Sequence, residues 1–255
     1  MSALHHLYGA HKPWPEFKPV NDSIRGGNST SEWSVSRRTN VATFSGLLDI
    51  TALGGAGFAS QSTLFEPTRL SLPRSTYSGL SLSVSLPPLD KLASLDDDKP
   101  RDPPVPTKFV LIVKPTKPAT RPDGRRESVV GYEFEFDVAR LAATEEATAT
   151  TSRIVAVEAP WHEFQATYRG RPKQDAPELD PSDIYELSVM CRSNFGKQAG
   201  PFSLDIVSLS AVRNERPSRS VAELAHRLWT RIASMLLNVR LWLTGGSRDG
   251  AVRLD

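Results

Sequence analysis

Histidine side chains are the first candidates for acid–base or metal-ligating chemistry in this sequence. The five histidines are His5, His6, His11, His162 and His226. No two of them have the spacing of paired metal ligands on a helix, and none lies in an H-E-x-x-H motif. His162 precedes Glu163, a pairing more typical of a loop or a strand edge than of a catalytic base. We therefore expect no catalytic histidine and no metal site.

Cys191 is the only cysteine of the chain. A single thiol cannot form an intramolecular disulfide or the cysteine cluster of a zinc site, since each requires at least two. The fold must therefore depend on packing, and the chain suits a reducing compartment. The sequence also contains no G-x-S-x-G elbow and no phosphate-binding G-x-x-x-x-G-K-[ST] loop. An enzyme is accordingly the least favoured of the function classes that we consider.

Two glycine clusters resemble fragments of nucleotide-binding or RNA-binding motifs. The glycines at 54–57 follow an expected strand, but the helical periodicity that a Rossmann fold needs does not follow them. The single Arg-Gly-Gly segment at 25–27 is explained more simply by a tight turn. With 31 Lys and Arg against 29 Asp and Glu, the formal charge is only +2, which argues against a dedicated nucleic-acid binder. We expect no cofactor and no nucleic-acid partner.

The length and composition indicate which elements would position functional residues. The chain has 255 residues, 39% of them hydrophobic, and can bury a substantial core. Its 20 prolines and 16 glycines favour many short strands over a helical bundle. It contains no uncharged apolar run of about 18 residues, the length that a membrane-spanning helix needs.

Alternating apolar and polar residues predict β-strands. Leucine and valine alternate with serine at 80–86, and aromatic residues alternate with acidic ones at 132–138. Further strands are expected at 41–50, 109–114, 153–158, 184–191 and 202–209. Strands of this number and spacing predict an all-β fold, either an antiparallel sandwich or a jelly roll.

Several segments are expected to lie outside the sheets. We expect flexible tails at 1–13 and 245–255, and a disordered insertion rich in proline and aspartate at 87–107. The segment 115–128 carries Arg121, Arg125 and Arg126. For these arginines a solvated turn is favoured over a phosphate site.

Residues 218–244 predict a C-terminal amphipathic helix, because apolar residues recur at helical spacing. Ser220 and Glu223 match a capping box at its start. The simpler interpretation is that its apolar stripe packs on the sheets. The alternative is that the helix binds a partner or a membrane surface, with Trp229 and Trp242 among the contact residues.

Short motifs follow one another in a fixed order from Trp14 to Val212. They are Asp22-Ser-Ile-Arg-Gly-Gly-Asn-Ser29, Phe44-Ser-Gly46, Gly55-Ala-Gly-Phe-Ala-Ser60, Tyr77-Ser-Gly-Leu80, Ala159-Pro-Trp-His-Glu-Phe164, Arg169-Gly-Arg171 and Gly200-Pro-Phe-Ser-Leu-Asp-Ile206. In this order they resemble the complex I intermediate-associated protein 30 family. The resemblance implies a galactose-binding-like jelly roll, here over residues 14–212.

The same resemblance implies a function. Members of the family assist assembly of mitochondrial respiratory complex I as chaperone-like, non-enzymatic factors. The expected partners are complex I subunits or other assembly factors, with the C-terminal helix as the place of any peripheral membrane contact. The implied location is the mitochondrion. A cytoplasmic location is the alternative, because residues 1–20 resemble neither a transit peptide nor a signal peptide.

The first motif allows two interpretations. In the structural one, its glycines serve tight turns, and Asp22 and Ser29 fix the loop by side-chain hydrogen bonds to the backbone. In the functional one, Asp22, Arg25, Asn28 and Ser29 line an exposed rim that grips a partner, since binding residues gather on loops of a rigid scaffold.

A carbohydrate-binding or small-ligand-binding module is the alternative function. Jelly rolls bind sugars by stacking them on aromatic rings, and Trp14, Trp33 and Trp161 are the candidates for such stacking. This alternative requires at least one of these rings to be exposed on a concave face.

Overall fold

A computed structural model describes residues 3–86, 103–122, 124, 126–143, 153–214 and 229. The chain divides into two compact units, Met1–Asn214 and Glu215–Asp255. Trp229, the one described residue of the second unit, has helical backbone and a side chain that is 73% exposed. The rest of the helix expected at 218–244, and the tail expected at 245–255, lie outside the described residues.

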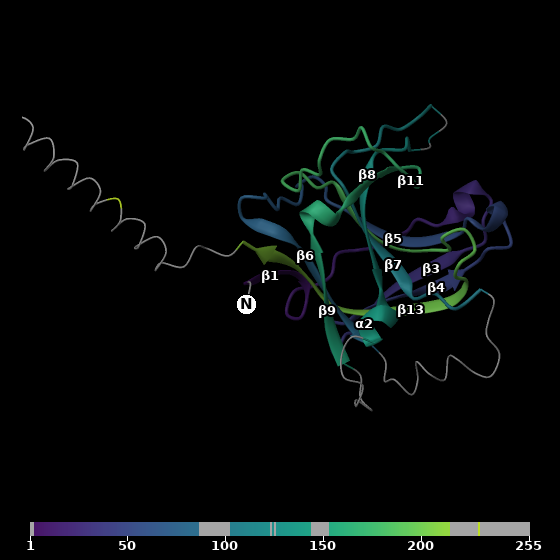
Figure 1. The fold of residues 1–255 in the computed structure, drawn as a ribbon, viewed down its shortest axis with the longest axis horizontal. Helices are drawn as coiled ribbons and strands as arrows, with labels where there is room; N and C mark the ends of the chain where they lie inside the picture. The colour runs from purple at the N-terminus through teal and green to yellow at the C-terminus, as the bar shows by residue number, and fades with distance from the viewer. Residues whose placement is uncertain are drawn as a thin grey trace, which may run out of the picture. The chain divides into compact units, whose positions relative to one another are not determined.

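Two antiparallel sheets build the first unit (Figure 1). The six-stranded sheet has the order β3-β4-β13-β6-β9, with β1 also paired to β13; the strands are β1 (Leu4–Gly9), β3 (Thr30–Val35), β4 (Ala42–Leu48), β6 (Tyr77–Leu86), β9 (Arg153–Pro160) and β13 (Gly200–Arg213). The seven-stranded sheet has the order β11-β10-β8-β7-β12-β5-β2, formed by β2 (Lys18–Pro19), β5 (Phe58–Leu64), β7 (Lys108–Lys114), β8 (Gly131–Asp137), β10 (Gln165–Tyr168), β11 (Arg171–Pro172) and β12 (Glu186–Arg192). The expected all-β jelly roll is confirmed.

Short helices connect some of the strands. They are η1 (Asp22–Arg25), η2 (Leu53–Gly55), α2 (Val138–Ala143) and η3 (Trp161–Glu163). Within the described ranges, no helix has the length and apolar character needed to cross a membrane.

The hydrophobic core lies between the two sheets. Phe44 of β4 is fully buried, and its ring centroid lies 5.0 Å from that of Phe202 on β13 and 6.2 Å from that of Phe109 on β7. These rings therefore join the two layers. Burying one such side chain contributes about 2–3 kcal/mol to folding, so this cluster fixes the sheets against each other.

The strands predicted from alternation are confirmed. The patterns at 80–86 and 132–138 form β6 and β8, and the other five expected strands correspond to β4, β7, β9, β12 and β13. On β6 the alternation directs Leu80, Leu82 and Val84 into the core. One face of the strand is therefore packed between the layers, as the pattern indicates.

The flexible tail predicted at 1–13 is wrong for residues 4–9, which form β1. β13 is 14 residues long; its first half pairs with β4, and its second half pairs on the same side with β1. Without β1, the backbone N–H and C=O groups on this side of the second half would form an open sheet edge. Pairing with β1 satisfies their hydrogen bonds. Leu7, Tyr8 and Trp14 also pack against the core.

The insertion predicted at 87–107 lies outside the described residues up to position 102. Its last five residues are described, and they are held to the sandwich. The Gln198 side-chain oxygen accepts hydrogen bonds from the backbone N–H groups of Thr107, at 3.0 Å, and Lys108, at 3.1 Å. The prediction of disorder is therefore wrong for 103–107, because a buried amide fixes their entry into β7.

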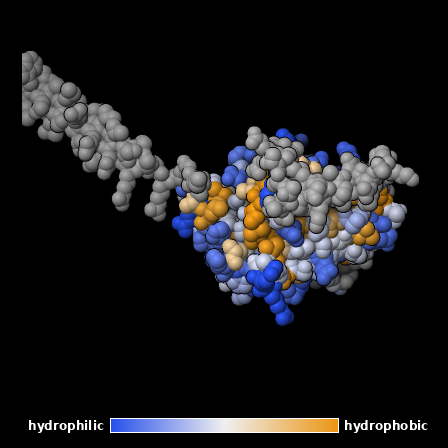
Figure 2. Space-filling view, turned by 90° about the horizontal axis from the view of Figure 1, so that it is seen from below, coloured by the Kyte–Doolittle hydropathy of each residue, from blue (hydrophilic) through white to orange (hydrophobic). Residues whose placement is uncertain are grey.

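On the face shown in Figure 2, hydrophilic residues surround apolar residues that gather into a band. Among the described residues of the first unit, the most exposed large apolar side chains are Phe195, Ile24 and Ile154, at 82%, 73% and 64%. Two of these, Phe195 and Ile24, border a groove.

Candidate functional site

A groove of about 2160 Å³ lies over the outer face of the seven-stranded sheet. Its floor is formed by the side chains of β5, β7, β8, β10 and β12 that point away from the core. On β12, for example, Glu186, Met190 and Arg192 line the groove, while Leu187 and Val189 face the core. Small-molecule pockets usually measure about 300–1,000 Å³. The groove is therefore large enough for an extended ligand.

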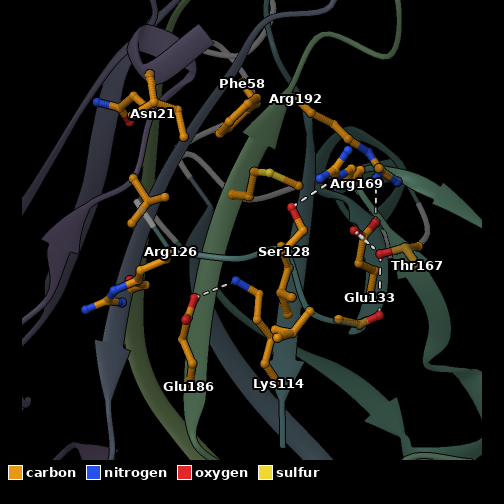
Figure 3. A pocket seen from close by; sticks show the side chains of 18 of the residues that line it. Asn21, Phe58, Lys114, Arg126, Ser128, Glu133, Thr167, Arg169, Glu186 and Arg192 are labelled. Atoms are coloured by element: carbon orange, nitrogen blue, oxygen red, sulfur yellow. Dashed lines mark hydrogen bonds and ion pairs between the residues drawn. The ribbon is translucent and has the colours of Figure 1, made fainter. Parts of the chain in front are cut away.

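An ion pair occupies one part of the floor (Figure 3). Lys114 of β7 and Glu186 of β12 are opposite each other in the sheet, with 2.7 Å between Lys114 Nζ and Glu186 Oε1. The Glu186 side chain is only 6% exposed, and the Ser188 hydroxyl donates a second hydrogen bond to the same carboxylate oxygen at 3.0 Å. One oxygen of the buried carboxylate, Oε1, thus receives two donors.

A second charged cluster surrounds Arg192. Its Nη1 lies 2.5 Å from Glu133 Oε2, and its Nη2 lies 3.0 Å from Glu135 Oε2. The Thr167 hydroxyl donates to the other oxygen of Glu133 at 2.6 Å. Burial alone would lower the pKa of Arg192, but the two carboxylates outweigh burial and raise this pKa above its ordinary value. Arg192 is therefore a permanently charged residue within the sheet surface.

These contacts decide what the floor can do chemically. Both oxygens of Glu133, and Oε1 of Glu186, accept from a cation and a hydroxyl, so both carboxylates are engaged as acceptors. Apolar side chains, among them Ile112 and Met190, lie between the charged ones. Paired charges interspersed with apolar surface favour contact with a ligand over proton transfer to it.

The rim of the groove carries further arginines. Arg25 of η1 lies over the Phe58 ring, with 5.7 Å from its guanidinium carbon to the ring centroid. Across the sheet, Arg169 Nε donates to the Ser128 hydroxyl oxygen at 3.2 Å. Arg126 and Arg171 also line the groove. Arginine thus lies at both ends of the site.

Asp22 and Ser29, two of the residues expected on a partner-binding rim, are buried. The Asp22 carboxylate accepts hydrogen bonds from Ser29 N at 3.0 Å, from Ser29 Oγ at 2.7 Å and from Phe58 N at 3.0 Å. It therefore fastens the first motif to the start of β5. For these two residues the structure has the hydrogen bonds of the structural interpretation, and neither is accessible to a partner.

Arg25 and Asn28 of the same motif are exposed. Arg25 borders the groove, while the Asn28 side chain reaches the Thr51 hydroxyl at 3.5 Å. Trp229 is exposed in the second unit, and Trp242 lies outside the described residues. Partner binding by these four residues stays a prediction.

The tryptophans expected to stack on sugars do not line the groove. Trp161 is buried, and its Nε1 donates to the Tyr77 carbonyl at 2.9 Å. Trp14 and Trp33 are half-buried against each other, with ring centroids 5.6 Å apart, and Phe17 stacks on Trp33 at 4.0 Å. None of the three rings is fully exposed: Trp161 is buried, and Trp14 and Trp33 are partly buried against the core.

The other residues singled out from the sequence for chemistry are His162 and Cys191. His162 lies in η3 with its Nε2 3.9 Å from Glu163 Oε1, and both side chains are exposed and line the groove. Burial raises the pKa of the Cys191 thiol well above its ordinary value. In the part of the chain that the structure describes, no three His, Cys, Asp or Glu side chains group as metal ligands.

The floor residues were not identified from the sequence. Glu133 and Glu135 occupy the polar positions of the alternation at 132–138, which indicates an outer face but not a site. Their partner Arg192 is 59 and 57 residues away along the chain. Only the register of the strands brings these charges together, so a single sequence carries no signal for them.

The Lys114 and Glu186 pair can be tested by a double-mutant cycle with Lys114→Met and Glu186→Gln. We expect Glu186→Gln to lower the free energy of unfolding by about 2 kcal/mol and the pair to couple by about 1 kcal/mol, because one partner is buried. Urea unfolding of the four proteins measures this. The exposed pair Lys173 and Asp175, 2.9 Å apart, is the control and should show no measurable coupling. Equal coupling in both pairs would contradict the burial argument.

Comparison with known proteins gives a family match and fold similarities. The model of the family described as complex I intermediate-associated protein 30 matches residues 6–86 and 139–206. The uncharacterized protein C9E9.15 of Schizosaccharomyces pombe is 31% identical to this chain over 216 residues, which is 83% of this chain and 85% of that protein.

The similar solved structures include carbohydrate-binding modules. The family 11 module of the cellulase Lic26A-Cel5E of Clostridium thermocellum aligns with a TM-score of 0.45 and 9% identity over 86% of this chain and 99% of that one. The family 11 module of the same organism in complex with a β-1,3-1,4-mixed-linked tetrasaccharide aligns with a TM-score of 0.48 and 8% identity, over 83% and 97%. These similarities concern the fold.

Proposed function

Because the chain belongs to the complex I intermediate-associated protein 30 family, we propose that it is a non-enzymatic assembly factor for mitochondrial respiratory complex I. It binds assembly intermediates through complex I subunits or other assembly factors, and it works in the mitochondrion. The match of the family model to residues from both sheets is the observation that carries this proposal.

The mechanism is binding without turnover. A factor that binds one intermediate more tightly than its competitors raises the population of that intermediate by the difference in affinity. The groove supports this mechanism, since it offers a large surface whose acidic floor residues are already engaged in ion pairs. The loops that carry Arg25 and Asn28, together with the predicted C-terminal helix, are the further contact regions of the proposal.

Affinity purification of the tagged full chain from cells that assemble complex I tests this function. We expect subunits of assembly intermediates, or other assembly factors, to be enriched at least about tenfold over a tag-only control, and the tag to localise to mitochondria. The fully assembled complex should not be enriched, because the factor binds intermediates. Recovery of neither subunits nor assembly factors from correctly localised protein would contradict the proposal.

A further inference from the structure

We propose that the groove over the seven-stranded sheet binds an extended, acidic polypeptide segment of the partner. This inference rests on the proposed function only in that the segment would belong to an assembly intermediate. Four observations carry it: the charges of the lining, the placement of the unpaired arginines, the width of the sheet, and an apolar pair at one end.

The groove lining has more positive than negative side chains. Among the described residues, eight lysines and arginines line it against six glutamates. Every one of these glutamates lies within 4 Å of a basic side chain, as in the pairs of Glu186 with Lys114 and of Glu127 with Arg121. Five of these glutamates are paired with four Lys and Arg side chains, and Glu163 is paired with His162, which is charged only when protonated. The described lining therefore carries a surplus of two positive charges.

Four lining arginines, Arg25, Arg126, Arg169 and Arg171, have no ion pair within 4 Å among the described residues, and Glu66 interacts with Arg126 at longer range. All four are exposed. Arg169 and Arg171 lie on the β10–β11 hairpin, and the contact of Arg169 with Ser128 holds this hairpin to the segment that carries Arg126. A guanidinium group forms two parallel hydrogen bonds with a carboxylate, so these residues favour an acidic ligand.

The width of the sheet sets the length of the segment. From β10 to β5 the order of strands has four intervals. At about 4.8 Å each they span about 19 Å, which an extended chain rising about 3.3 Å per residue crosses in about six residues. A peptide of eight to ten residues would therefore reach from the arginines of the hairpin to Arg25 at the other end.

An exposed apolar pair marks the Arg25 end. Phe195 and Ile24 both line the groove. Phe195 has a φ of +61°, between Asn194 at +49° and Gly196 at +81°, so its backbone is in the left-handed region that bulky residues avoid. The preceding Ser193 fixes this turn, since its N–H donates to the Gly57 carbonyl at 2.9 Å. An aromatic side chain held out in this way fits an apolar side chain of the partner.

The same charges argue against a neutral oligosaccharide. Sugar rings stack on exposed aromatic faces. Among the described lining residues the only exposed Phe, Tyr or Trp ring is that of Phe195, whereas four guanidinium groups without an ion pair are available, and Trp14, Trp33 and Trp161 do not line the groove. Carboxylates along a peptide would use these guanidinium groups directly. An acidic segment with one apolar residue near its end is thus the occupant that the lining fits.

Fluorescence anisotropy of the purified full chain tests this inference. The probe is a labelled ten-residue peptide of alternating Glu and Ser with one terminal Leu; the controls are the same peptide with Lys in place of Glu and a mixed-linkage β-glucan tetrasaccharide. We expect the acidic peptide to bind, its affinity to fall at higher salt, and the controls not to bind. Absence of acidic-peptide binding at millimolar protein, or binding of the tetrasaccharide alone, would overturn the inference.

Paired variants show whether the peptide occupies the groove. The double variant Arg126→Glu, Arg171→Glu should weaken peptide binding at least about tenfold, because two guanidinium groups are replaced by carboxylates that repel the acidic peptide. The double variant Arg37→Glu, Arg38→Glu makes the same change of charge at exposed positions that do not line the groove. It should weaken peptide binding less than about twofold. Phe195→Ser should weaken binding of the acidic peptide about threefold or more, because its terminal Leu loses the aromatic contact. Equal effects of the two double variants would overturn the groove as the binding surface.

The assembly function and peptide binding in the groove can be disproved independently of each other. If affinity purification recovers assembly intermediates but the acidic peptide does not bind, the assembly function stands and the groove inference is wrong. If the peptide binds in the groove but no intermediate or assembly factor is recovered, the groove inference stands and the assembly function is wrong.

Discussion

Replacing Asp22 by alanine will lower the free energy of unfolding by about 4 kcal/mol. The carboxylate is completely buried and accepts three hydrogen bonds from Ser29 and Phe58. Its removal leaves these donors without their acceptor, and each buried unsatisfied group costs about 1–3 kcal/mol. Urea unfolding of the full chain, followed by intrinsic tryptophan fluorescence, measures the loss as a lower midpoint at unchanged slope.

Asp180→Ala is the matched control. Asp180 also accepts two hydrogen bonds from a nearby serine, Ser182, at 2.9 and 2.6 Å, but it lies on the surface. Its replacement should change the free energy of unfolding by less than about 0.5 kcal/mol. If Asp22→Ala fails to fold, Asp22→Asn, which keeps one acceptor oxygen, should still lose about 2 kcal/mol. A loss at Asp22 no greater than at Asp180 would show that the motif is not fastened by this carboxylate.

Replacing Gly46 by alanine will cost about 3 kcal/mol of unfolding free energy. A Cβ at this position of β4 would lie 2.0 Å from the Thr30 carbonyl oxygen on β3 and 2.9 Å from Phe202 Cζ. A backbone carbonyl cannot move away by changing rotamer as a side chain can, so the two strands must separate. Overpacking of this kind costs about 1–3 kcal/mol or more. Thermal and urea unfolding of the variant measure the effect.

Gly131→Ala on β8 is the control for this substitution. Its Cβ would meet the nearest atom, Ile112 Cγ2, at 3.4 Å, which is ordinary van der Waals contact. We expect a change of less than about 0.5 kcal/mol. Equal losses at Gly46 and Gly131 would mean that the close approach of β3 to β4 is not what requires glycine.

These contacts explain why the first and third motifs of the family resemblance contain these residues. Asp22 belongs to the first motif and binds the Phe58 N–H of the third. A Cβ on Gly27 would lie 2.3 Å from the Asp22 side chain, and a Cβ on Gly57 would lie 2.0 Å from the Asp49 carbonyl oxygen. The order of the motifs was visible in the sequence, but their meeting around one buried carboxylate depends on the fold.

Strands with apolar alternation could be predicted from the sequence, and strands without it could not. β5 contains Ser60, Gln61, Ser62 and Thr63, all of them buried. Some of their polar groups find partners on distant strands, as where Gln61 Nε2 donates to Ser31 Oγ at 3.1 Å, whereas the buried Gln61 Oε1 has no hydrogen-bond partner among the described residues. A polar run of this kind resembles a loop until its partners are known, so β5 was missed.

The candidate site was the least predictable part. Lys114 and Glu186 are 72 residues apart along the chain, and their pairing follows from the register of β7 against β12. The alternation showed which positions of β8 face outwards, but the arginines of the rim come from short elements and turns whose placement depends on the finished sandwich. A surface assembled from distant strands and loops cannot be derived from local pattern alone.

Native-gel electrophoresis of mitochondria from cells that express the tagged full chain tests the central claim most directly. If the protein acts by holding assembly intermediates, the tag will migrate with high-mass species that also contain complex I subunits, and it will be absent from the mature complex. If the tag migrates only at the mass of the free chain while those intermediates are present on the same gel, the chain does not bind them and the proposed function is wrong.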